Sequence, residues 1–151
     1  MEQRILRLTN LNDVSTELKS LESGPVETTA TWSFYQILSH CSDDLESSIK
    51  GNRKPFPWVI RVTLGNLLKR KFLKDGFYTR PAMAGGKGRR IEGDEKAALV
   101  RLRKAVADFM ALPNQPISHI FFGKITKEEC EKLTVYHIAH HLGFACLKKS
   151  T

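Results

Sequence analysis

A histidine pair on the apolar face of a C-terminal helix is the feature that most constrains this chain. The segment from Tyr136 to His141 holds three of the five histidines. An apolar stripe with helical steps runs through Cys130, Leu133, His137, His141 and Phe144. Residues four apart lie on one helix face, so the two imidazoles stack one turn apart. Unpaired polar groups are costly there, which predicts a metal ligand or a catalytic base.

Capping residues mark where the helices begin. Asparagine is a favoured cap, so Asn10 or Asn12 is expected to open the first helix, which ends before Gly24. Two capping boxes, whose paired side chains bond free backbone amides, open further helices. They are Ser33 with Gln36 and Thr126 with Glu129.

Two more helices are expected between these capping boxes. One covers about residues 57–74, with an inward face made of Ile60, Leu64, Leu67, Leu68 and Phe72. Another begins at Asp94 or Glu95 and ends before Pro113. Between them lies a long irregular segment, residues 75–93.

The apolar faces all have period 3.6, and no long strand pattern is found. Phe121 and Phe122 form a short extended piece at most. We therefore predict an all-α fold, a helical bundle in one domain covering residues 1–151. Bundles build metal and cofactor sites from side chains on facing helices.

The cysteines argue against a disulfide framework. Cys41, Cys130 and Cys146 are odd in number and widely spaced, which favours a reducing compartment. Cys41 and Cys130 fall on apolar stripes and are interpreted as core residues. No secretory signal and no membrane-spanning run are found. We expect a cytoplasmic protein without a membrane partner.

The formal net charge is +8, with pI near 9.6. Much of this charge lies in Arg53–Lys54, Lys69–Lys71, Lys87–Arg90 and Lys148–Lys149, not on one helix face. Solvated surface is the simpler interpretation, and an anion-attracting mouth is the alternative. The glycine-rich basic loop, residues 84–90, lacks the order of a phosphate-binding P-loop. A flexible loop is expected there, and a nucleic-acid partner is not.

The HxxxH spacing of His137 and His141 supplies two metal ligands, and a catalytic zinc takes three. The third is expected from His40, with His119 as second choice, and spacing alone also allows a His137/His140 pair. No glutamate follows His137, so a zincin protease is not supported. Histidines bonded to backbone or carboxylates remain the structural alternative.

Other side chains near these histidines have simple structural interpretations. Asp43, Asp44 and Glu46 could orient an imidazole, but a solvated helix face explains them more simply. Trp32 could line a cavity, although aromatic residues at helical spacing usually serve packing.

Three segments together resemble the DinB/YfiT-like superfamily of metalloenzymes, and more narrowly a bacterial branch of it. They are residues 32–40, 119–129 and 137–142, in this order and spacing. The resemblance spans roughly Leu8 to Phe144. It implies an up-and-down four-helix bundle with a long crossover connection, often as a homodimer. It also implies a divalent metal, zinc or nickel, held by His40, His137 and His141.

Characterised members of that superfamily include thiol S-transferases using low-molecular-weight thiols, and metal-dependent hydrolases or isomerases. The resemblance therefore implies a metal-dependent enzyme with a small-molecule substrate, acting by thiol S-transfer or hydrolysis. His119 and His140 are candidates for proton transfer or for supporting the ligands. Cys130 and Gly143 depart from the family pattern, so the substrates of characterised members are not assigned to this chain. The alternative is a non-catalytic helical-bundle binding or structural protein.

Overall fold

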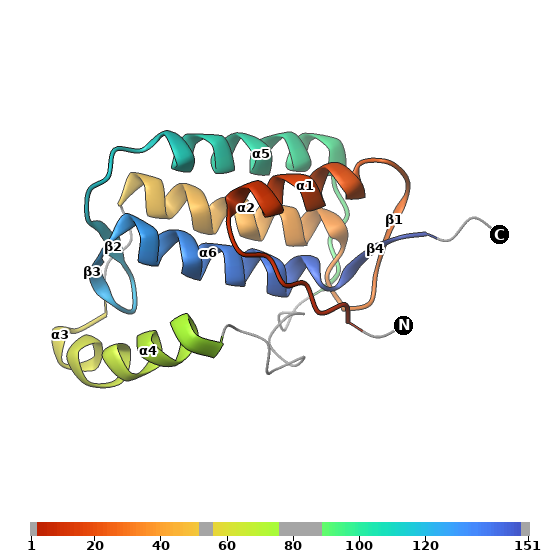
Figure 1. Ribbon diagram of the computed structural model, residues 1–151. Helices are drawn as coiled ribbons and strands as arrows, with labels where there is room; N and C mark the ends of the chain where they lie inside the picture. Colours follow the sequence, from red (N-terminus) through yellow and green to blue (C-terminus); the bar gives the residue numbers. More distant parts are fainter. Residues whose placement is uncertain (1–2, 52–55, 76–88, 149–151) are drawn as a thin grey trace.

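Four long helices pack side by side around the core. The computed structural model describes residues 3–51, 56–75 and 89–148. Its long helices are α1 (Leu11–Leu21), α2 (Phe34–Lys50), α5 (Glu95–Ala111) and α6 (Lys127–Leu142). Figure 1 shows them as one bundle, with a further helix, α4 (Asn66–Asp75), beside α6.

The predicted helix starts are confirmed. The observed caps of the four long helices are Asn10, Ser33, Asp94 and Thr126. Both capping boxes form, since the side chains of Gln36 and Glu129 each accept a hydrogen bond from the backbone of their cap. These local bonds satisfy backbone amides that a helix N-terminus leaves free.

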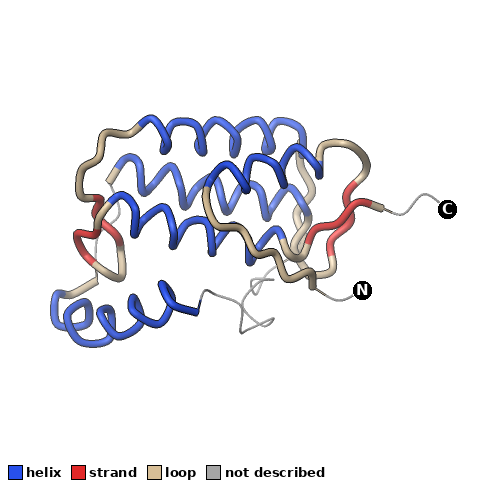
Figure 2. Tube along the Cα trace, viewed as in Figure 1, coloured by secondary structure: helices blue, strands red, loops and turns tan. Residues whose placement is uncertain are grey.

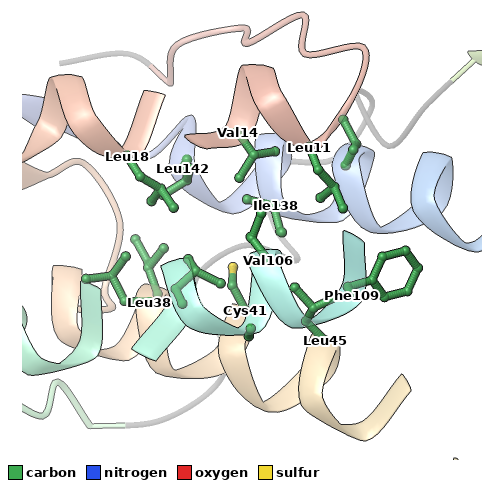
Figure 3. Close-up of a cluster of buried hydrophobic side chains, with 14 of the residues drawn as sticks. Leu11, Val14, Leu18, Leu38, Cys41, Leu45, Val106, Phe109, Ile138 and Leu142 are labelled. Atoms are coloured by element: carbon green, nitrogen blue, oxygen red, sulfur yellow. The ribbon is translucent and has the colours of Figure 1, made fainter. Parts of the chain in front are cut away.

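The helices meet through the apolar stripes that their spacing predicts. All four contribute buried side chains to the cluster drawn in Figure 3. The labelled residues are Leu11, Val14, Leu18, Leu38, Cys41, Leu45, Val106, Phe109, Ile138 and Leu142. Burial raises the pKa of the Cys130 thiol to about 11, and Cys41 is also buried as a free thiol. Both cysteines are core residues, as expected.

A long crossover joins α2 to α5, and the two helices run in the same direction (Figure 1). Ion pairs also join these two helices, because Arg101 of α5 bonds Asp43 at 2.6 Å and Glu46 at 2.8 Å on α2. The described part of the crossover contains α3 (Trp58–Ile60), the π-helical turn η1 (Arg61–Gly65) and α4. Lys69 of α4 bonds Glu129 of α6 at 3.1 Å, which holds the crossover against the bundle.

The all-α prediction is wrong, because two small antiparallel sheets accompany the helices. Strand β1 (Val26–Thr28) pairs with β4 (Ala145–Leu147), and β2 (Ile117–His119) pairs with β3 (Gly123–Ile125). Figure 2 shows these pairs at opposite ends of the bundle. Three-residue strands are too short to display a period of two. The fold is therefore mixed, and Phe121 and Phe122 lie in the turn between β2 and β3.

The predicted inward face of the crossover helix is partly wrong. Leu68 and Phe72 pack against the core as expected, but Ile60 is 44% exposed and Leu67 is 69% exposed. The π-helical turn η1 adds a residue between Ile60 and α4, so an α-helical count assigns Ile60 to the wrong face. Leu67 lies about 100° around α4 from Leu68 and so falls outside the inner face. The side chain of Leu64 lies outside the described part of the chain.

The expected flexible loop lies mostly outside the described ranges. Of the glycine-rich basic loop, residues 84–88 lie outside them, and Arg89 and Arg90 lie inside. Within the described ranges, no helix has both the length and the apolar character needed to cross a bilayer.

Leu102, fully buried on α5, tests the core. Leu102→Ala should lower the free energy of unfolding by about 2–5 kcal/mol, because it removes buried methyl groups and leaves a cavity. Val100, 61% exposed on the same helix, supplies the control. Val100→Ala should change it by at most about 0.5 kcal/mol. Equal, small effects of both changes in urea denaturation would contradict this packing.

Candidate metal centre

Two neighbouring helices bring three imidazoles together. His40 lies on α2 beside the buried Cys41, at the edge of the apolar stripe. His137 and His141 lie one turn apart on α6, which packs against α2. Because the same contact buries both stripes, side chains at the edges of the two stripes face each other. His40, His137 and His141 therefore form one histidine cluster, as the sequence predicts.

The cluster has the dimensions of a metal site. Nε2 of His137 lies 3.2 Å from Nε2 of His40 and 3.0 Å from Nε2 of His141. All three potential ligand atoms lie within 4.8 Å of one another. Nitrogens about 2.0–2.1 Å from a tetrahedral ion are roughly 3.3–3.4 Å apart. The two separations from His137 therefore differ from this spacing by a few tenths of an ångström, and the third separation, at most 4.8 Å, would have to match it when a divalent ion binds.

Asp44 supports the cluster from behind. Its Oδ2 lies 3.1 Å from Nδ1 of His137, and each side chain is 24% exposed. The contact does not have hydrogen-bond geometry, and a small rotation of either side chain would let Nδ1 donate to Oδ2. Such a bond would keep the proton on Nδ1 and direct the Nε2 lone pair at the cluster. From the sequence, a place on the solvated face of the helix was the simpler interpretation of Asp44. Its position four residues after His40 puts both side chains on one face of α2, and this spacing could have indicated that Asp44 lies near the histidines.

Hydrogen bonds among the Nε2 atoms of His40, His137 and His141 cannot all be well aligned. A neutral imidazole nitrogen without a proton has one lone pair in the ring plane. If Nδ1 of His137 carries the proton, its Nε2 can accept one well-aligned bond, although two histidine nitrogens approach it. Burial, then repulsion from His137 and His40, lowers the pKa of His141 to about 2. His141 therefore carries no extra proton at neutral pH, whereas one cation could contact all three nitrogens.

Trp32 forms an aromatic wall on the cluster. Its ring stacks on His141 at a centroid distance of 5.7 Å and meets His40 edge-on at 5.1 Å. The Thr28 hydroxyl donates to the backbone oxygen of Trp32 at 2.8 Å, which fixes the segment before α2. The wall limits water on the side of His141, which is 4% exposed. His137 keeps the more open side.

His140 lies next to the cluster without joining it. Its ring meets the rings of His141 at 5.2 Å and Phe144 at 5.7 Å, both edge-on. Burial, together with repulsion from His137, lowers the pKa of His140. Of the two pairs that the spacing allowed, the structure therefore brings together His137 and His141.

His119 lies apart from the three histidines. It sits on β2, where its ring stacks on Phe122 at 4.6 Å and its Nδ1 accepts from the Phe121 amide at 3.2 Å. This strand adjoins the start of α6, whereas His137 is ten residues into that helix, roughly 15 Å along its axis. His40, and not His119, completes the cluster.

The chain matches one family model, described as "Protein of unknown function (DUF1569)", over residues 1–148. The match covers nearly the whole chain, so the protein belongs to this family. Neither a curated protein nor a solved structure matches it. The family description names no activity, and the histidine cluster is the feature from which a function can be argued.

Replacing Asp44 tests its support of His137. Asp44→Asn should weaken metal binding about 10–100-fold, because the charged acceptor behind the imidazole is lost. The neighbouring Asp43 bonds Arg101 on the surface instead, so Asp43→Asn is the matched control. Competition with a chelating dye measures both affinities. Equal affinities in the two variants would exclude this role for Asp44.

The lowered pKa of His141 predicts a pH dependence of stability. Between pH 6.5 and about 2 the unfolded chain binds a proton that the folded His141 does not. The free energy of unfolding of chelator-treated protein should therefore decrease as the pH is lowered below 6.5. This group contributes a decrease of up to about 1.4 kcal/mol per pH unit. Urea denaturation at pH 7, 6 and 5 measures the slope. His141→Gln should show a shallower slope, and an unchanged one would contradict the assignment.

Proposed function

We propose that this protein is a metal-dependent enzyme whose divalent ion, zinc or nickel, is held by Nε2 of His40, His137 and His141. The observation that carries the proposal is the convergence of these nitrogens, at 3.0 Å and 3.2 Å around His137. Imidazole suits zinc and nickel, and three protein ligands leave a position for water or substrate.

The chain's own residues divide the work at this site. The three imidazoles would hold and orient the ion, and Asp44, 3.1 Å from Nδ1 of His137, would favour the tautomer that this requires. Trp32 covers the cluster beside His141 and limits the entry of water. A small substrate approaches on the side of His137, whose side chain is 24% exposed.

The proposed reaction is thiol S-transfer or hydrolysis of a small molecule. A divalent ion in such a site lowers the pKa of a bound thiol or water and so supplies a nucleophile near neutral pH. The resemblance to the DinB/YfiT-like superfamily supports this class. His140 is the candidate to accept the released proton, because its ring lies beside His141 at a centroid distance of 5.2 Å.

A second candidate function is a non-catalytic bundle with hydrogen-bonded histidines. The same Nε2 separations lie within hydrogen-bond range, which favours this reading for the metal-free chain. In that case His40 or His141 donates to His137, and the cluster serves stability.

Metal content of the purified protein distinguishes these functions. Zinc- or nickel-loaded protein should contain about one ion per chain, and His40→Ala, His137→Ala or His141→Ala should each abolish stoichiometric binding. His140→Ala and His119→Ala are the controls and should keep the ion. Elemental analysis after dialysis makes the measurement. A metal-free wild type, even after reconstitution, would favour the non-catalytic bundle.

A further inference from the structure

The excess positive charge of this protein lies in the crossover between α2 and α5. Residues 51–91 carry 11 of the 24 lysines and arginines but one of the 16 acidic residues. The remaining 13 basic residues are outnumbered by 15 acidic ones elsewhere in the chain. The crossover is therefore a basic element attached to a slightly acidic bundle.

The helical part of the crossover has an inner and an outer face. On the inner face Leu68 and Phe72 pack on the core, and Lys69 bonds Glu129. The outer face, defined here as Trp58, Val59, Val62, Leu67, Arg70, Lys71 and Lys74, is exposed throughout. Its apolar members are 50% to 69% exposed. No acidic residue occurs between residues 56 and 74.

The apolar half of the outer face continues onto the β2–β3 turn. Phe56 and Phe121 stack at a centroid distance of 5.1 Å and are 40% and 49% exposed. The Phe56 amide donates to the carbonyl of Ile120 at 3.0 Å, which fixes this junction. A continuous group of exposed apolar side chains marks an interaction site more often than single exposed residues do.

We infer that the outer face docks on the surface of an anionic lipid bilayer. Helices that lie in the bilayer interface combine lysine or arginine with tryptophan, phenylalanine and leucine, as this face does. Trp58 suits the headgroup region. The basic turn at Arg70, Lys71 and Lys74 complements anionic lipids. The expectation of no membrane partner considered spanning segments, whereas this helix would lie on the surface.

Charge and chemistry disfavour two other occupants. A second copy would bring two faces together that carry Arg70, Lys71 and Lys74 and no acidic side chain. A nucleic acid would pair with the basic residues but leave Val59, Val62 and Leu67 without apolar contacts. An anionic bilayer complements both halves of the face. The inference does not depend on the metal centre.

Vesicle co-sedimentation of the full chain tests the inference. The protein should bind vesicles of phosphatidylcholine with about 30% phosphatidylserine and should bind pure phosphatidylcholine at least about tenfold more weakly. Both Val62→Ser/Leu67→Ser and Arg70→Glu/Lys71→Glu should weaken binding to the anionic vesicles at least about tenfold.

Matched variants on the bundle control for apolarity and net charge. Val100→Ser/Met110→Ser alters exposed apolar residues of α5, and Lys96→Glu/Lys132→Glu makes the same charge change on α5 and α6. Both should bind like wild type. The inference fails if anionic vesicles are not bound, or if the charge control loses as much affinity as Arg70→Glu/Lys71→Glu. It also fails if the serine pair instead dissociates a dimer, or if duplex DNA binds as tightly as vesicles.

Discussion

The contact between α2 and α6 is the constraint on which the candidate site depends. Leu38 and Cys41 on one helix and Ile138 and Leu142 on the other are fully or almost fully buried. Burial of these side chains stabilises the helix pair and fixes its rotation, because turning either helix would expose them. The histidines at the edges of the two stripes are therefore held close together. Hydrophobic packing thus holds a polar cluster that would be costly to assemble alone.

Much of this arrangement could be predicted from local sequence. The cap at Asn10 and the capping boxes act within four residues, so the helix starts were confirmed. The HxxxH spacing predicted that His137 and His141 share a face. The position of His40 at the inward edge of an amphipathic helix made it the first choice for the third ligand, and the resemblance to the DinB/YfiT-like superfamily implied the same residue. The cluster brings these three together and leaves His119 apart. The metal, the reaction and the membership of that superfamily remain proposals.

The parts that sequence reasoning missed depend on contacts between distant residues or on helix irregularity. Strand β1 pairs Val26 with Leu147 across most of the chain, and three residues carry too little pattern to predict it. The π-helical turn lies between Ile60 and α4, so an α-helical count misplaced Ile60 relative to Leu68 and Phe72. Asp44 was assigned to solvent because its partner His137 lies on another helix. Each error came from applying a local rule where tertiary contacts decide.

The central claim is that one divalent ion binds three imidazole nitrogens in this protein. X-ray absorption spectroscopy at the zinc edge of the loaded protein tests it most directly. The geometry predicts three imidazole nitrogens at about 2.0–2.1 Å, one oxygen from water, and no sulfur. His40→Ala should lose stoichiometric zinc, and zinc that binds this variant only at excess metal should show at most two imidazoles. A shell with sulfur, or with one imidazole in the wild type, would contradict the assignment of His40, His137 and His141 as the ligands.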